Sequence, residues 1–522
     1  MFIRLRVDCR EGAQLALALT VAACATGTPR IDGQAGAPSG PATLWPVAAR
    51  ARTPAPPASP PAAPVIAAAL ARDAVLIGGV RTLGLPDVID LVLRNNPTTR
   101  ESWALARSAA STYGAARGAL LPTVALDVNA TRTGGTSLSG SNGLNGSSGG
   151  TDGTTTGTFS SGAATRTQLA PALSLSYLLL DLGGRSGSIE TARQRAIAAD
   201  LTHNATVLDA VLQVESMLFT FLANRALRDA QLVSVGEAQA DLTAATERQR
   251  LGVATVQEVL QTRTALSQAR FELATQEGNL LAARGNLSFA MGLPANTRFE
   301  IPAIAASDSV ADVLASVDTL INRAVTARPE LAQARAEAAS FAAQVRVARA
   351  AALPALSLRA STGVTSTYTG ATTTTRPFSV GLGLSIPVFS GFSAQYDIRA
   401  AREQYEASQA RVATVQQQIS VQVFTAYFQL RAATERVRSA TDLLTSAQQS
   451  ATVALARYRE GVGTIVDVLL ARSALATARA EAVQSRWQWR MALAQLSHDA
   501  GVLDLRGQPN LPLGAGAPGG NR

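Results

Sequence analysis

The chain carries the stretch RQRLGVATVQEVLQTRTALSQAR at residues 248–270 and a close copy, RYREGVGTIVDVLLARSALATAR, at residues 457–479. Matching positions in the two copies keep one spacing: Gly252 and Gly461 are 209 residues apart, as are the arginines that end each stretch. An internal repeat of this kind defines the architecture before any local signal does, so a duplicated half of roughly two hundred residues is the unit of the fold.

A second register links the halves upstream of this stretch. Asn96-Pro97 and Arg328-Pro329 are 232 residues apart, and a Leu-Pro step follows each of them at the same spacing. The two spacings differ by 23 residues, and the difference falls in a Gly/Ser/Thr-rich loop. That loop is long in the first half, at 133–167, and shorter in the second, at 362–376.

Composition argues against compact globules. Aromatic residues make up only 5% of the 522 residues, and alanine is abundant, which suits long helices that pack closely through small side chains. The chain has no lysine and a net charge of +9, but its arginines are scattered along the predicted helices. Because nucleic-acid binding needs clustered basic residues, we exclude it.

The N-terminus has the layout of a secretory signal. Arginines come first, and a short apolar stretch ends before Cys24. Residues 1–23 are therefore predicted to be a signal peptide, with 21–24 as a bacterial lipobox and Cys24 as the lipidated first residue. An ordinary signal peptide with an incidental Cys24 is the alternative. The apolar stretch is too short to span a bilayer, and no helical membrane span is expected later in the chain.

The flanking segments differ in composition from the repeats. Residues 24–81 are rich in Pro and Ala and are predicted to form an extended tether, and residues 504–522 a disordered tail. The first repeat then covers 82–303 and the second 304–503.

Each repeat follows the same order of elements. A helix of about 35 residues, at 85–118 and again at 312–351, ends at a Leu-Pro step because proline disfavours helix in the residue before it. After a hairpin, a proline-free segment with 4-3-4-3 apolar spacing predicts a helix of about 100 Å, and a shorter helix returns beyond the Arg-x-x-x-Gly-Val motif.

Strict alternation of apolar and polar residues predicts strands at about 122–132 and 168–180, and at about 354–364 and 376–388. Strands of this length cross a bilayer when tilted, with lipid on the apolar face. A small soluble β-element with one buried face is the alternative. Four strands cannot close a barrel, and open edges in lipid are costly, so several copies must pool their strands in a cyclic oligomer.

These features resemble the TolC-like outer-membrane efflux family, in its lipoprotein branch. The resemblance rests on the duplication, the Asn-Asn-Pro at 95–97, the Arg-Pro-Glu at 328–330, Ser390-Gly391 and the motif from Arg457 to Leu469. It implies a mixed α/β membrane protein: a homotrimer with a shared twelve-stranded barrel above a tunnel of long α-helices. It also implies an outer-membrane location, anchored by lipid and extending into the periplasm.

In that family the Gly-containing turns at the periplasmic tip meet a membrane-fusion adaptor. The resemblance places this contact at Arg248, Gly252, Val253, Thr255, Arg457, Gly461, Val462 and Thr464. Both turns would also be tight corners in which Gly is a helix C-cap.

The family closes its tunnel with acidic residues just beyond this turn, which makes Asp467 and Glu258 the candidate gate. A ring of carboxylates would raise its own pKa values and attract cations. Leu470 stands where the family can show a second acidic residue, and a solvated charge on a helix face is the alternative role for Asp467.

Signals of catalysis are absent from the sequence. His203 and His498 are isolated and are predicted to lie on helix surfaces, and no motif suggests a catalytic residue, a metal site or a cofactor. The leading hypothesis is therefore a passive exit duct of a tripartite efflux system for drugs, metals or other small molecules. Its partners would be an adaptor and an inner-membrane pump, of the resistance-nodulation-division type rather than the ABC type. A duct for type I protein secretion and a soluble periplasmic coiled-coil scaffold are the alternatives.

Overall fold

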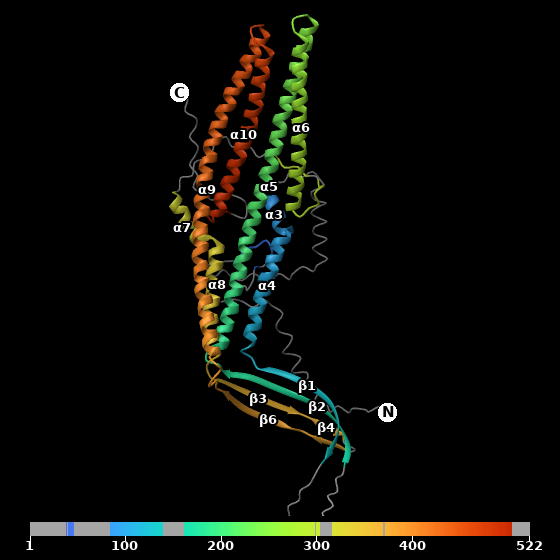
Figure 1. The fold of residues 1–522 in the computed structure, drawn as a ribbon, viewed down its shortest axis with the longest axis vertical. Helices are drawn as coiled ribbons and strands as arrows, with labels where there is room; N and C mark the ends of the chain where they lie inside the picture. The colour runs from blue at the N-terminus through green and yellow to red at the C-terminus, as the bar shows by residue number, and fades with distance from the viewer. Residues whose placement is uncertain are drawn as a thin grey trace, which may run out of the picture. The chain divides into compact units, whose positions relative to one another are not determined.

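A computed structural model describes residues 38, 40–45, 84–138, 161–297, 299–302, 316–368 and 371–503 (Figure 1). The predicted signal peptide, Cys24, most of the predicted tether and the predicted tail lie outside these residues. The chain divides into two compact units. The helical unit contains the residues up to Ser111, Arg193–Ala339 and those from Ala407 onward, and the sheet unit contains Thr112–Ala192 and Ser340–Glu406.

Eight helices in the described residues follow the two spacings of the sequence. The bounds of α9 and α10 are those of α5 and α6 shifted by 209 residues, and α7 and α8 are α3 and α4 shifted by 232. The helices are α3 (Leu85–Asn95), α4 (Pro97–Gly118), α5 (Gly184–Arg250), α6 (Val256–Ala290), α7 (Val317–Ala327), α8 (Pro329–Ala350), α9 (Ser393–Arg459) and α10 (Ile465–Asp499).

The prediction of one helix of about 35 residues at the start of each half was wrong. Asn96 interrupts the first and Arg328 the second, each with an extended ψ, of 123° and 128° respectively. Both residues precede a proline, whose ring clashes with a helical conformation of its neighbour. The same proline then begins the following helix, where its missing N–H costs nothing.

Two apolar clusters form the core of the helical unit, one for each half. The first joins α3 to the middle of α5 and the end of α6, with Ile89, Leu218 and Leu287 at its centre. The second repeats this arrangement with α7, α9 and α10, around Leu320 and Val423. Each half therefore buries its own short helix against its own long hairpin.

Among the described helices, α5 alone has the length and apolar composition of a candidate membrane span. Half of its apolar 18-residue window is buried inside the protein. Val207, Val211, Val214, Leu218 and Phe221 of this helix belong to the first apolar cluster. The apolar stretch is thus accounted for by the core, because a core helix meets the same criteria of length and composition.

The sheet unit holds six antiparallel strands in the described residues. β1 pairs with β2, β2 with β3, and β3 with β6, while the short β4 pairs with β5 and with the far end of β2. The strands are β1 (Thr123–Leu138), β2 (Ser161–Leu180), β3 (Ala355–Gly363), β4 (Thr365–Tyr368), β5 (Thr372–Thr375) and β6 (Phe378–Ser385).

The register gives the four long strands two chemically different faces. Val124, Leu175, Ala360 and Val380 are partners across successive strands, so one face is continuously apolar. The other face is small and polar, and hydroxyl contacts cross it, such as Ser361 to Ser379 at 2.8 Å. The period-two alternation in the sequence therefore predicted the faces correctly.

The lengths of the strands differ from the prediction. β1 and β2 continue to the pair Leu138 and Ser161, well beyond the predicted ends, since the Thr, Ala and Gly residues there keep the ladder in register. In the second half, residues 362–376 were predicted to be loop, but β4 and β5 occupy most of this stretch. Threonine is β-branched and favours extended backbone, which explains the short ladder.

A short segment within the predicted tether packs on the helical unit. The backbone N–H of Trp45 donates to Asn204 Oδ1 (2.6 Å), and Asn204 Nδ2 donates to the Trp45 carbonyl (2.8 Å). The Trp45 indole is buried against Ala198, Leu201 and Ala336. One asparagine side chain thus holds both backbone groups of Trp45.

We expect Asn204→Ala to release this segment while the helices stay intact. The substitution removes both side-chain partners of the Trp45 backbone and leaves a buried peptide group unsatisfied. Hydrogen–deuterium exchange should show faster exchange of the peptide containing Trp45. Thr206→Ala on the same helix, a half-buried threonine whose hydroxyl bonds to its own helix, is the control. Unchanged exchange in Asn204→Ala would contradict the assignment.

Candidate functional site

The two repeated motifs form matching turns, one from α5 to α6 and one from α9 to α10. Gly252 has φ of 77° and Gly461 φ of 78°, a left-handed conformation that favours glycine. The N–H of the following valine then donates to the carbonyl of the arginine five residues back, Arg248 or Arg457. Each long helix therefore ends in a glycine cap, as the sequence predicted.

Both candidate gate residues cap the helix that returns. Thr255 is the N-cap of α6, and Glu258 accepts a hydrogen bond from its backbone N–H at 3.3 Å. Asp467 accepts from the N–H of Thr464 at 3.1 Å and from its hydroxyl at 2.9 Å. These bonds hold the pKa of Asp467 below its usual value. Each carboxylate thus completes a capping box, a local role that the sequence analysis did not assign.

Tyr458 connects the two turns. Its hydroxyl donates to Glu258 Oε2 at 2.9 Å, and the Arg248 guanidinium lies over its ring, 4.6 Å from the centroid. Burial, and then the hydrogen bond and charge of Glu258, raise the pKa of Tyr458. The sequence analysis missed this residue. Its signal was a difference between the repeats, because Gln249 stands at the matching position of the first half.

The two matched arginines therefore have different surroundings. Arg248 is half-buried against the other half of the protein, whereas Arg457 is exposed beside its own turn. Around them both turns present apolar side chains to solvent: Leu251, Val253, Val256, Val462 and Leu470 are each at least 60% exposed. The turns form a surface on which glycine leaves room for a partner backbone.

A group of ion pairs joins α5 to α10 away from the turns. Glu237 accepts two hydrogen bonds from Arg479, both at 2.9 Å, and lies 3.0 Å from Arg472. Arg472 also lies 3.5 Å from Asp241. Burial raises the pKa of Asp241 above its usual value, and the charge of Arg472 opposes part of this rise. Both arginines belong to the repeated motif, so these ion pairs give it a structural role inside the chain.

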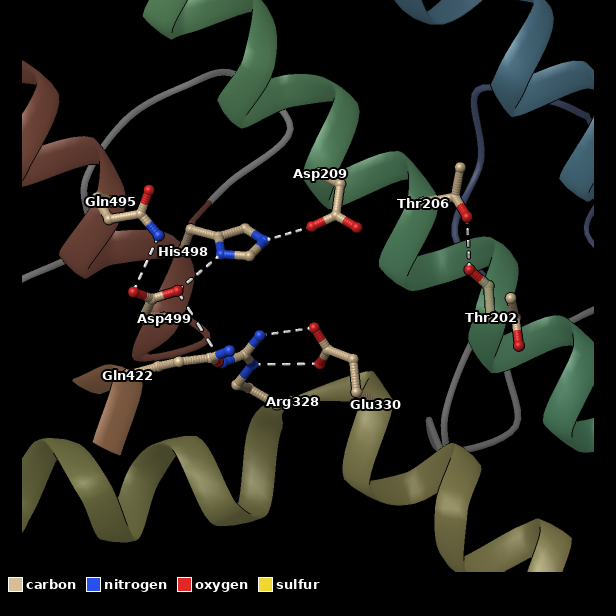
Figure 2. A network of polar contacts seen from close by, with 9 residues as sticks. All are labelled: Thr202, Thr206, Asp209, Arg328, Glu330, Gln422, Gln495, His498 and Asp499. Carbon is tan, nitrogen blue, oxygen red and sulfur yellow. Dashed lines mark hydrogen bonds and ion pairs between the residues drawn. The ribbon is translucent and has the colours of Figure 1, made fainter. Parts of the chain in front are cut away.

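A second polar network centres on His498 (Figure 2). Its ring nitrogens lie 3.0 Å from Asp209 Oδ1 and 3.1 Å from Asp499 Oδ1. Burial lowers the pKa of His498, but the hydrogen bonds and charges of the two aspartates outweigh it and raise the pKa to about 9. An imidazolium can donate to both carboxylates at once, so the charged form fits this geometry.

Arg328 extends the network from the break between α7 and α8 (Figure 2). It pairs with Glu330 at 2.7 Å, donates to Gln422 of α9 and lies 4.0 Å from Asp499. A cavity of about 540 Å³ adjoins these residues. The network thereby ties together α5, α8, α9 and the end of α10.

The prediction that both histidines lie on helix surfaces was wrong. His203 is fully buried, with Ser102 and the Thr43 carbonyl as partners, and His498 is 9% exposed. Each lies on a helix face that a partner segment covers, which the local sequence does not reveal. Within the described part of the chain, no three His, Cys, Asp or Glu residues are arranged to hold a metal ion.

A twice-repeated helical hairpin joined to an open antiparallel sheet is the scaffold of a channel protein. A family model described as outer membrane efflux protein matches residues 88–293 and 320–502. These matches cover most of the chain, which therefore belongs to the outer membrane efflux protein family, with a TolC-like channel fold.

Known relatives agree with this assignment. Protein CyaE of Bordetella pertussis is 27% identical over 436 residues, covering 82% of this chain and 86% of that protein. TtgC of Pseudomonas putida, a probable efflux pump outer membrane protein, is 23% identical over 348 residues, covering 65% and 69%. The open-state outer membrane channel MtrE of Neisseria gonorrhoeae matches the fold with a TM-score of 0.66 at 19% identity, covering 80% and 89%.

We expect the stability of the helical unit to fall as the pH rises from about 6.5 to 9. The folded pKa of His498, about 9, lies above its unfolded value of 6.5, so its contribution is complete below pH 6.5 and is lost through pH 9. Glu215, whose pKa burial raises from 4.5 to about 7, loses its own contribution between those two pH values and so adds only at the start of this window.

Thermal melts followed by circular dichroism should show this decline. In His498→Gln the loss of unfolding free energy across this pH range should be smaller by up to about 3 kcal/mol. His203→Gln is the control, since burial lowers the pKa of His203 and its titration falls below this window. A decline that is as steep in His498→Gln as in the native chain would contradict the prediction.

Proposed function

We propose that three copies of this chain form a passive exit duct in the outer membrane, as the channel component of a tripartite efflux system. The observation that carries this proposal is the sheet. Within the described residues, β1 pairs only with β2, and β6 pairs only with β3. One long edge of each strand is therefore without a partner.

The chemistry of the sheet supports a position in lipid. Large apolar side chains such as Leu126, Val128, Val380 and Leu382 are more than 60% exposed, and the residues that alternate with them along each strand are small or polar. Lipid would cover this face, but it cannot satisfy the N–H and C=O groups of an open edge, which cost several kcal/mol each. Pairing the β1 edge of one copy with the β6 edge of the next closes the wall, and three copies give twelve long strands.

The turns support a contact with a periplasmic adaptor. Gly252, Val253, Gly461 and Val462 present small or apolar exposed surface, Thr255 and Thr464 fix the helix starts, and Arg457 offers exposed donors. An adaptor hairpin that offers apolar side chains and acceptors would fit this surface. The relative TtgC is named as part of an efflux pump, which supports an efflux role. The resistance-nodulation-division type of the inner-membrane pump and the lipidation of Cys24 follow from the family resemblance of the sequence.

The same turns can close the duct. Tyr458 and Arg248 hold the second turn against the first, with Glu258 as the acceptor. The turns cannot separate until this contact breaks. In a three-fold assembly Glu258 and Asp467 would form acidic rings beside the contact and would favour cations over anions.

Deleting the gene should raise susceptibility to dyes, detergents, drugs or metals, and the native gene should restore resistance. Val462→Asp should restore it poorly, because a charge in the exposed apolar turn would be desolvated by the adaptor. Leu105→Asp, at an exposed leucine on α4, is the matched control and should restore it fully. Unchanged susceptibility on deletion, with loss of a secreted protein instead, would replace efflux by type I secretion.

Tyr458→Phe should increase single-channel conductance in planar bilayers severalfold, since it removes the hydroxyl bond to Glu258 without changing the ring that packs on Arg248. Tyr396→Phe, at an exposed tyrosine at the start of α9, should leave conductance unchanged. If Tyr458→Phe conducts as the native protein does, the contact is structural and does not close the duct.

A further inference from the structure

The internal repeat makes one helix seam inside the chain and leaves its image open. Inside the chain, α5 packs on α10. Phe219 meets Trp487 with ring centroids 6.0 Å apart, Glu237 binds Arg479, and Asp209 binds His498. Adding 209 to the residue numbers of α5 gives α9, and subtracting 209 from those of α10 gives α6. The repeat therefore relates the α5–α10 seam to an equivalent seam between α9 and α6.

The image residues have a different chemistry. Phe219 corresponds to Phe428, but Trp487 corresponds to Gly278, so a large ring would face a gap. A Cβ added at Gly278 would meet nothing within 4 Å in the chain. Glu237 corresponds to Ser446 and His498 to Phe289, so one partner of each ion pair in the first seam is replaced by a small or apolar residue.

Exposed apolar residues follow both image faces. At 100° per residue, those on α9 fall within an arc of about 100° that also contains Ser446, and those on α6 fall within a similar arc around Gly278. Phe271 is 69% exposed and Phe289 is 78% exposed. The α9 residues are Val421, Phe424, Phe428, Leu443 and Val453, and the α6 residues are Leu260, Phe271, Leu281 and Phe289.

We propose that this face of α9 packs against this face of α6 in a second copy of the chain, with Phe428 seated over Gly278. The register is that of the internal seam, which also places Phe424 beside Leu281 and brings Asp442 near Arg263 and Arg270. The proposal rests on the proposed oligomeric duct and adds the partner surface to it. The seam inside one copy then combines ion pairs with an aromatic contact, and the seam between copies is mainly apolar, with a socket at Gly278.

A two-tag crosslinking experiment tests the register. A copy with Gly278→Cys and one tag is co-expressed with a copy carrying Phe428→Cys and a second tag, and the membranes are oxidised. A disulfide needs Cβ atoms about 3.5–4.5 Å apart, so a crosslinked dimer with both tags is expected. Gln429→Cys, about 100° around α9 from Phe428, is the control partner for Gly278→Cys and should give none.

A second variant does not depend on cysteine geometry. Gly278→Trp fills the socket, so native mass spectrometry should show loss of the oligomer while circular dichroism shows intact helices. Gly236→Trp is the matched control, because Gly236 also lies in a helix with nothing within 4 Å of its added Cβ. It should assemble as the native chain does.

The outcomes separate this proposal from the duct itself. A native chain that stays monomeric in mild detergent overturns both. Stable oligomers without the two-tag crosslink, or with Gly278→Trp still assembling, overturn the seam and leave the duct standing, with the α9 face free for another protein.

Discussion

The backbone edges of β1 and β6 are the constraint on which the rest of the protein depends. A strand in lipid has no water to satisfy its N–H and C=O groups, so an open edge there must find another strand. In the part of the chain that the structure describes, the sheet has four long strands and therefore two open edges. In the duct proposed above, other copies of the same chain supply the missing neighbours.

Duplication supplies the strands and helices of one half a second time, but the two halves have not stayed equivalent. The halves share helix bounds to the residue, whereas their side chains diverge at positions where the environments differ. Glu237 and Ser446 are one example, since the first has two arginine partners inside the chain and the second has an exposed position on α9. Such differences distinguish surfaces that are satisfied within one copy from surfaces that are open.

The turns show the same division between shared and diverged positions. Gly252 and Gly461, with Thr255 and Thr464, keep one backbone geometry in both halves because positive φ and a helix N-cap each restrict the residue type. Tyr458 occurs in one half only, and it ties the turns together through Glu258 and Arg248. The residues that the two halves share thus preserve the shape of the turns, and Tyr458, which they do not share, makes the contact between them.

The sequence by itself determined the repeat, the long helices, the faces of the strands and the two glycine turns, because each depends on local periodicity or backbone conformation. Tertiary structure alone decided that His203 and His498 are buried, that Trp45 is held by Asn204 and that Glu237 pairs with Arg472 and Arg479. These contacts join residues that are far apart in the chain. Their side chains are those of ordinary solvated helix faces, and only packing reveals which faces are covered.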